Sequence, residues 1–214
     1  MNPILLAAKA AAVFHEGQTR KYDGSPYIVH PGRVAARISM HPRGTEAMVC
    51  AAWLHDVIED CGASSEGIAN ALADSTLGLP GAQEVARLVT ELTNPSKKFP
   101  DFCRADKKAL DRKHFMSVSM EAKMIKLADR TDNLRDLAGA PDDFALMYFN
   151  ESAMLFTAMT GCGTELRTHD CDIISWTSTV DQELEQEFAD ALDALKSRMP
   201  GSSATTSSMT ATNR

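Results

Sequence analysis

The segment from Thr45 to Ile58 constrains the fold of this chain more than any other. After Thr45, a residue that favours the start of a helix, apolar side chains follow at positions spread around the whole helical circumference: Ala47, Val49, Cys50, Trp53, Leu54, Val57 and Ile58. A helix that is apolar on most sides has to be covered on most sides. The segment therefore predicts a helix at the centre of the molecule, with the polar pair His55 and Asp56 inside it.

Helical spacing and capping signals predict further helices on both sides of this segment. Asn2 followed by Pro3 is a capping residue before a proline at the first helical position, which predicts a helix to Phe14. Apolar periodicity predicts helices over about 31–38, 65–75, 82–92, 119–137, 141–160 and 180–197. Residues 16–29 and 161–179 are rich in turn formers and predict irregular structure, while residues 96–118 are polar and basic without a clear pattern. No alternating strand pattern occurs, so we expect an all-α, single-domain helical bundle.

Length and composition indicate one domain in a reducing compartment. The 214 residues suit a single domain, which we place at 1–198, and the Ser- and Thr-rich residues 199–214 predict a disordered, low-complexity tail. The chain has five cysteines, at Cys50, Cys61, Cys103, Cys162 and Cys171. Because their number is odd and no CxxC pair occurs, we expect free thiols. No apolar run reaches the roughly 18 residues that a membrane span needs. We therefore expect a cytoplasmic protein without a membrane partner.

The charge distribution predicts a small anionic ligand and argues against nucleic acid. The net charge of −7 is unsuited to coating nucleic acid or an anionic membrane. Residues 97–113, however, carry seven Lys or Arg against three Asp, a net charge of +4, which leaves −11 for the rest of the chain. Such asymmetry could draw a multiply charged anion to one side of the molecule; a solvated face is the alternative reading for each single lysine. Whether the chain forms a homo-oligomer stays open.

A set of polar residues within apolar surroundings indicates a metal site. On a helix, residues four apart share a face, which pairs His55 with Glu59, Asp56 with Asp60, and Asp129 with Asn133. Burying so many ionisable groups is costly unless they are paired or bind a metal. A divalent cation would offset that cost if it were held by His30, His55, Asp56 and Asp129. Two imidazoles and two carboxylates suit Mn²⁺ or Fe²⁺ and do not exclude Zn²⁺.

Spacing alone leaves a structural alternative open. His30 stands before a proline and could simply begin a helix, and Asp129 could be one half of an ion pair with Arg130. Three stretches in a fixed order bear on that choice: HEGQTRKYDGSPYIVHPGRVA (His15–Ala35), AAWLHDVIEDC (Ala51–Cys61) and KLADRTDNLRDL (Lys126–Leu137), with VTELTNP (Val89–Pro95) between the last two. Together they resemble the HD-type hydrolase domain of RelA/SpoT proteins, and in particular the stand-alone small alarmone hydrolases that include the metazoan SpoT homologues.

This resemblance implies a fold, an activity and a role for individual residues. It implies an HD-type helical bundle with one buried divalent metal, most commonly Mn²⁺, on His30, His55, Asp56 and Asp129. Glu59 and Asp60 match an acidic pair that activates or positions the attacking water, and Asn133 matches an active-site asparagine. Residues implied or expected to contact the nucleotide are Arg20, Lys21, Tyr27, Lys97, Arg104, Arg112 and Tyr148. The implied reaction removes the 3′-diphosphate of (p)ppGpp or (p)ppApp as pyrophosphate.

The chain departs from the family pattern around the expected nucleotide pocket. Thr131 and Asp132 replace a larger pair that is often aromatic or contains His, and Cys61 stands where many relatives have Thr. By a rough alignment, Tyr148 and Ser152 stand where metazoan-type relatives carry an Arg and a Tyr. Guanine or adenine preference therefore stays open. Two other functions also stay open: a phosphatase acting on another nucleotide such as NADPH, and a non-catalytic nucleotide sensor.

Overall fold

The computed structural model describes residues 1–161 and 180–198, and over these ranges every regular element is helical. The elements are α1 Pro3–Phe14, α2 Val29–Met40, α3 Glu46–Leu54, α4 Val57–Cys61, α5 Ser65–Leu72, α6 Gly78–Leu92, the 3₁₀ turn η1 Pro95–Lys98, α7 Arg104–Ser117, α8 Met120–Asp136, the 3₁₀ turn η2 Leu137–Gly139, α9 Asp142–Thr160 and α10 Gln182–Ser197. The predicted all-α class is confirmed. The irregular segment and the tail expected from the sequence, with Cys162, Cys171 and His169, lie outside the described residues.

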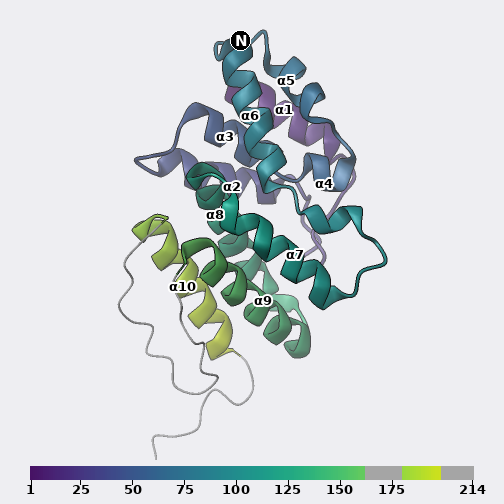
Figure 1. Ribbon diagram of the computed structural model, residues 1–214, viewed down its shortest axis with the longest axis vertical. Helices are drawn as coiled ribbons and strands as arrows, with labels where there is room; N and C mark the ends of the chain where they lie inside the picture. The colour runs from purple at the N-terminus through teal and green to yellow at the C-terminus, as the bar shows by residue number, and fades with distance from the viewer. Residues whose placement is uncertain (162–179, 199–214) are drawn as a thin grey trace, which may run out of the picture.

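The helices form two groups that meet at α8. In Figure 1, α1, α3, α5 and α6 occupy the upper half of the view, while α7, α9 and α10 occupy the lower half. Helix α8 lies between them and packs on α2, α3 and α6 from one group and on α9 and α10 from the other. The buried side chains of α8 therefore face one group or the other. Within the described residues, no helix is both long and apolar enough to cross a membrane.

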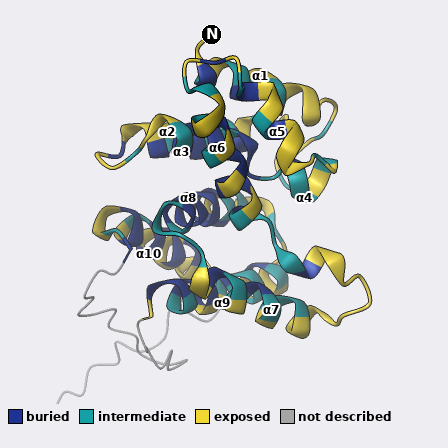
Figure 2. Ribbon diagram, turned by 45° about the horizontal axis from the view of Figure 1, so that its top comes forward, coloured by how far each residue is buried: buried dark blue, intermediate teal, exposed yellow. Residues whose placement is uncertain are grey.

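Burial is most complete on α8 and α3. All residues from Lys126 to Asp132 are buried, although four of these seven side chains are charged, and the dark blue ribbon of α8 in Figure 2 shows this central position. On α3, the run from Met48 to Ala52 is buried as well. The sequence thus correctly predicted a covered helix after Thr45. It did not indicate that α8, a polar helix by composition, is buried on all sides too.

The predicted helix from Thr45 to Ile58 is interrupted at the two residues that matter most for chemistry. Helix α3 ends at Leu54 and α4 begins at Val57. Asp56 has φ −100° and ψ −6°, away from helical values, so His55 and Asp56 form a junction between two helices. The His55 ring occupies this break by donating from Nδ1 to the Ala52 carbonyl (2.8 Å), one of the end carbonyls that a helix leaves without a helical partner.

Helix boundaries differ from the sequence expectation at several places, and the differences at α6 and α7 have identifiable reasons. Helix α6 begins at Gly78, four residues early, because Pro80 stands in its first turn, where a missing N–H removes no helical bond. The unassigned residues 96–118 contain η1 and α7. Helix α7 is capped by the Cys103 thiol, which accepts from the Asp106 N–H at 3.4 Å, and cysteine is not a residue that signals a helix start. Helix α5 ends at Leu72, three residues earlier than expected.

Two close contacts determine how α2 sits against its neighbours. A Cβ atom added at Gly32 would lie 3.0 Å from Cη2 of Trp53, so only glycine lets α2 approach α3 this closely at the turn after His30. At its other end, α2 leads into His41, whose Nε2 donates to Asp181 (2.9 Å) at the start of α10. The same carboxylate caps α10 by accepting from the N–H groups of Glu183 (3.1 Å) and Leu184 (3.3 Å).

We predict that Asp181→Ala lowers the free energy of unfolding by about 2 kcal/mol, because it removes a helix cap and leaves the buried His41 without its partner. Urea denaturation followed by circular dichroism measures this change. Asp193→Ala is the matched control, since Asp193 is exposed on the same helix and should change stability by no more than about 0.5 kcal/mol. Equal stability of the two variants would contradict the assigned role of Asp181.

Candidate active site

The side chains of His30, His55, Asp56 and Asp129 converge from three separate elements. His30 lies in the first turn of α2, His55 and Asp56 form the junction between α3 and α4, and Asp129 lies on α8. One ligand atom from each of His30, His55 and Asp129 falls within 4.8 Å of the other two. Asp56 Oδ2 lies 2.9 Å from His55 Nε2 and 3.8 Å from His30 Nε2. His30, His55 and Asp129 therefore surround one point, and Asp56 lies beside it, next to both imidazoles.

The hydrogen bonds of both histidines turn the same ring nitrogen toward that point. His30 Nδ1 lies 2.7 Å from the Asp132 carboxylate, and His55 Nδ1 lies 2.8 Å from the Ala52 carbonyl. Because both partners can only accept, each Nδ1 carries the proton, and in the neutral ring each Nε2 presents a lone pair. His55 Nε2 is buried without a hydrogen bond of acceptable geometry. These residues fit a divalent cation, which would satisfy that atom.

The electrostatics of these residues also favour a nearby positive charge. Burial lowers the pKa of His55, but the adjacent Asp56 carboxylate outweighs it and raises the pKa to about 9. The pKa of Asp129 is lowered: burial opposes this shift, and the Lys126 ammonium and the His30 ring outweigh burial. The two carboxylates thus stay ionised within a buried cluster. A site with this charge attracts cations, whether protons or a metal.

Glu59 and Asp60 lie on α4, one turn beyond the junction. The Glu59 carboxylate accepts from the backbone N–H of Asn94 (3.0 Å) and from its side-chain amide (2.8 Å). Lys97 Nζ lies 3.2 Å from both the Glu59 and the Asp60 carboxylates. Burial and the negative charge of Asp56 raise the pKa of Asp60 despite Lys97. The expected acidic pair is therefore held next to the ligand cluster by the chain that follows α6.

The segment that carries Asn94 and Lys97 is itself anchored by a buried carboxylate. Asp111 on α7 accepts from the backbone N–H of Ser96 (3.1 Å) and from its hydroxyl (3.0 Å). This contact fixes η1 against α7 and so places Lys97 between the two acids. Asp111 could not be singled out from the sequence, because it is one of several charged residues on a polar helix.

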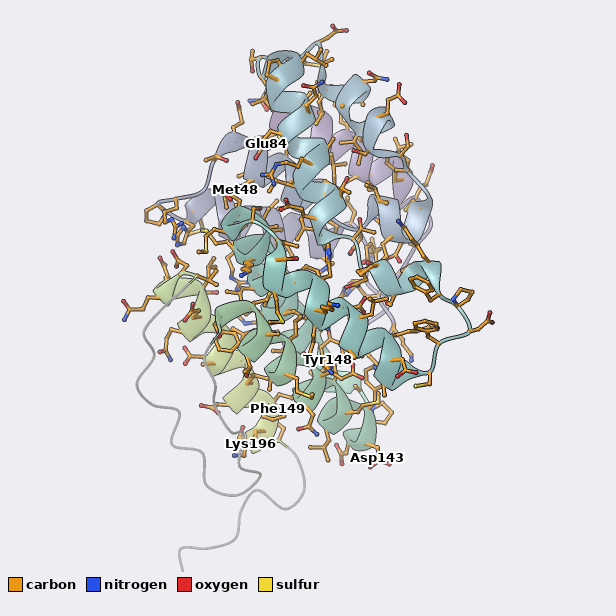
Figure 3. The ribbon with its side chains drawn as sticks, in the orientation of Figure 1. Met48, Glu84, Asp143, Tyr148, Phe149 and Lys196 are labelled. Atoms are coloured by element: carbon orange, nitrogen blue, oxygen red, sulfur yellow. The ribbon has the colours of Figure 1, made fainter. Side chains whose placement is uncertain are left out.

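Arg20, Lys21, Tyr27, Asn133 and Tyr148 line a cavity of about 250 Å³ beside the ligand cluster. Its other walls come from Thr19, Tyr22, Asp23, Asp136, Leu137 and Phe144. Tyr148 projects from α9, in the lower half of Figure 3. The Tyr27 hydroxyl donates to Asp56 (2.5 Å) and the Asn133 amide to Asp129 (2.5 Å), so two of the residues that line the cavity also touch the ligand cluster.

Arg20 and Lys21, the two basic residues of the loop before α2, have different contacts. Arg20 donates to Asp136 (2.7 Å) and to the Asn133 side-chain carbonyl (3.0 Å), and only 11% of its side chain is exposed. Lys21 Nζ lies 5.3 Å from the ring centres of both Tyr22 and Phe144, a cation–π arrangement. The structure thus brings both cations to the wall of one cavity.

The other predicted substrate residues are less closely grouped. Arg104 forms a two-point ion pair with Glu151 on α9 (2.6 and 2.9 Å). Arg112 lines a separate groove between α7 and α9. Of the three cations predicted from the basic stretch, only Lys97 contacts the acids near the ligand cluster.

Sequence reasoning missed several polar residues that the structure places around the site. Asp132 and Asp136 were not singled out as site residues. Asp132 nevertheless accepts a hydrogen bond from His30, and Asp136 accepts one from Arg20. Lys126 Nζ lies 2.8 Å from the other oxygen of Asp129 and is buried. A usable signal existed, because positions 126, 129, 132, 133 and 136 follow the three- and four-residue spacing of one helix face.

Comparison with known proteins agrees with this geometry. A family profile described as "HD domain" matches residues 7–160. The chain belongs to the HD domain family. A relative from Xenopus tropicalis named guanosine-3′,5′-bis(diphosphate) 3′-pyrophosphohydrolase MESH1 is 39% identical over 137 residues, which cover 63% of this chain and 69% of the relative. The human protein of the same name is 35% identical over 174 residues, 76% of this chain and 88% of that protein.

A solved structure confirms the HD fold. It is described as a metazoan ortholog of SpoT that hydrolyses ppGpp, and it aligns with a TM-score of 0.69 and 26% identity over 91% of this chain and 96% of its own. The resemblance to RelA/SpoT-type HD hydrolase domains that the three sequence motifs predicted is therefore confirmed. Within this family the chain is similar to the stand-alone MESH1-type proteins.

We predict that Mn²⁺ stabilises the metal-free HD protein through His55. A ligand at about 100 times its Kd adds about 2.7 kcal/mol, which raises the melting temperature of a protein of this size by about 5 to 10 °C. His55→Ala should abolish the increase. His114→Ala should retain it, because His114 bonds to the Glu91 carbonyl away from the cluster. A full Mn²⁺ response in His55→Ala would contradict the ligand assignment; differential scanning fluorimetry measures all three proteins.

Proposed function

We propose that this chain is a divalent-metal-dependent hydrolase that removes the 3′-diphosphate of (p)ppGpp-type nucleotides as pyrophosphate. The proposal depends most on one observation, which is a group of side chains that lie close together. Two buried histidines turn Nε2 toward two carboxylates, with an acidic pair on one side and a cavity lined by Arg20 and Lys21 on the other. The similarity to two proteins named as 3′-pyrophosphohydrolases supports the same activity.

His30, His55, Asp56 and Asp129 would hold one divalent metal, and we propose Mn²⁺. The mixed imidazole and carboxylate donors suit this borderline cation. When bound, the metal would polarise a phosphoryl oxygen and acidify a water molecule. The protein contributes the orientation of the ligands, because Tyr27 binds Asp56 and Asn133 binds Asp129.

Glu59 and Asp60 would serve the attacking water. During hydrolysis the water oxygen bonds to the phosphorus next to the ribose, the bond to the 3′ oxygen breaks, and that oxygen takes up a proton as pyrophosphate leaves. A carboxylate near the water accepts its proton. Lys97, which lies 3.2 Å from both acids, keeps them close together and partly offsets their charge.

Arg20, Lys21 and the aromatic walls of the cavity would bind the nucleotide. A guanidinium suits phosphate oxygens through its planar fork, and Asp136 and Asn133 hold Arg20 in one orientation. Tyr22, Phe144 and Tyr148 supply flat apolar walls on which a base can stack. Substrate binding by Arg104 would require opening of its ion pair with Glu151, and Arg112 would contribute only through long-range attraction.

Two other functions compete with this proposal. A phosphatase that acts on the 2′-phosphate of NADPH would use the same metal chemistry and release orthophosphate. A nucleotide sensor would use the same cavity and release nothing. The acidic pair Glu59 and Asp60 favours an enzyme, because nucleotide binding alone does not need it. The three free cysteines among the described residues agree with our proposal that the enzyme works in the cytoplasm.

We predict that the Mn²⁺-loaded protein releases pyrophosphate from ppGpp, and that Glu59→Gln reduces turnover by about 100-fold or more. The amide cannot take a proton from water, although it keeps the shape of the side chain. A coupled pyrophosphate assay and a parallel orthophosphate assay measure the products. Glu84→Gln is the matched control, since Glu84 pairs with Arg87 on the exposed side of α6 and should leave turnover unchanged. Orthophosphate as the sole product, or no product, would refute the proposed reaction.

The cavity offers little that distinguishes guanine from adenine. Discrimination needs polar groups that fit one base edge and leave unpaired groups with the other. Tyr22 lines the cavity, and its hydroxyl is buried without a hydrogen-bond partner. A hydroxyl without accessible surface does not reach a base edge, so it does not distinguish guanine from adenine. We therefore propose that both (p)ppGpp and (p)ppApp are substrates.

We predict that kcat/KM for ppGpp and ppApp differ by less than about 10-fold under one Mn²⁺ concentration. Initial rates of pyrophosphate release measure both values. A preference of more than about 100-fold for ppGpp, equivalent to about 2.7 kcal/mol in transition-state binding, would contradict the prediction and require a side chain that reads guanine specifically.

A further inference from the structure

The carboxylate of Asp132 lies behind the ring of His30, on the side away from the metal ligands. His30 Nδ1 donates to Asp132 Oδ2 at 2.7 Å, whereas His30 Nε2 lies 3.2 Å from Asp129. Only 5% of the Asp132 side chain is exposed. The two ring nitrogens of His30 thus have different partners, because Nε2 faces the other candidate ligands and Nδ1 is hydrogen-bonded to a buried carboxylate.

Asp132 is in turn held by Arg33, one turn after His30 on α2. Arg33 Nε donates to Asp132 Oδ1 (2.7 Å), and the terminal NH2 donates to Asp132 Oδ2 (3.0 Å). The same NH2 also lies 3.0 Å from both oxygens of Asp136. One guanidinium therefore binds two carboxylates on successive turns of α8. A planar fork holds the two acids in a fixed relation, which a flexible lysine does not do.

The second of these carboxylates serves the nucleotide cavity. Asp136 Oδ2 accepts from Arg20 Nε at 2.7 Å, and Arg20 also donates to Asn133, which binds Asp129. The contacts run from His30 through Asp132, Arg33 and Asp136 to Arg20, and return through Asn133 to Asp129. Arg33 stands at the middle of this path, and 39% of its side chain is exposed.

We propose that Asp132 and Arg33 are positioning residues: Asp132 orients His30 as a metal ligand, and Arg33 links that ligand to the phosphate-binding Arg20 through Asp136. The inference rests on the proposed metal site and function. A carboxylate that accepts from the outer nitrogen of a metal-bound histidine fixes the ring and makes it a better donor, and its loss typically weakens metal binding by about 10- to 100-fold. Asp132 has the geometry for this role.

Asp132 and Asp136 have different partners, so the proposal makes a separate prediction for each carboxylate. Asp132 contacts His30 and Asp136 contacts Arg20, so changes at the two positions should affect different measurements. Asp132→Asn keeps the size of the side chain and should weaken Mn²⁺ binding. Asp136→Asn should leave Mn²⁺ binding unchanged and raise KM for the nucleotide. Arg33→Ala should do both, because Arg33 holds both carboxylates.

Titration calorimetry of Mn²⁺ into the metal-free, full-length protein tests the metal branch. We expect the Kd for Mn²⁺ to rise by about 10-fold or more in Asp132→Asn and Arg33→Ala, and to stay within 2-fold of wild type in Asp136→Asn. KM for ppGpp at saturating Mn²⁺ tests the role of Asp136 in nucleotide binding. We expect KM to rise by about 5-fold or more in Arg33→Ala and Asp136→Asn, because the charge-assisted contact that holds Arg20 is loosened. Arg33→Lys keeps the charge without the fork and should fall between wild type and Arg33→Ala.

Arg135→Ala is the matched control, because Arg135 lies on the same helix and lines the same neighbouring cavity as Arg33 but approaches Glu187 instead (4.0 Å). Thermal melts of the metal-free variants separate positioning from folding. A lower melting temperature in Asp132→Asn with an unchanged Kd for Mn²⁺ would overturn the proposal. Wild-type protein that binds no Mn²⁺ would overturn the metal site as well, whereas normal wild-type binding with an unaffected Asp132→Asn overturns only the positioning role.

Discussion

The ionised carboxylate of Asp129, in the covered middle turns of α8, is the constraint on which the rest of this structure depends. An isolated charge at such a position would cost far more than a domain's net stability. The protein compensates with the Lys126 ammonium at 2.8 Å, the Asn133 amide at 2.5 Å and His30 Nε2 at 3.2 Å. His55 Nε2 lies 3.7 Å from the same carboxylate, and a divalent cation held by these residues would add to the compensation.

This requirement explains why the helices are arranged in two groups around α8. The group containing α2, α3 and α4 delivers both histidines and three of the acids, while α8 delivers Asp129 and the residues that orient its partners. Neither group alone can enclose the charge cluster. The cavity with Arg20 and Tyr148 forms where α9 and the loop before α2 meet the same end of α8. The residues proposed to bind substrate and metal therefore share one set of supporting contacts.

The sequence indicated the candidate ligands of the site better than the residues that hold those ligands in place. His30, His55, Asp56 and Asp129 could be singled out as candidate ligands because polar residues stood out against apolar neighbours and matched known motifs. The break between α3 and α4 could not be predicted, since both halves have good helical patterns and the His55 ring itself occupies the break. Asp132, Asp136 and Arg33 were missed because an Asp or Arg on a polar helix usually faces water. Only the position of α8 between the two groups makes them part of the site.

The contact between Gly32 and Trp53 has a consequence for the spacing of the two histidine rings. The distance between the axes of α2 and α3 sets how far apart the rings of His30 and His55 stand, and their centres are 5.1 Å apart. With glycine against the edge of a rigid indole, this spacing is at its lower limit and has little freedom to shrink further. A change at Gly32 would therefore act on the geometry of the candidate metal site from the opposite face of α2, without altering any of the four candidate ligands.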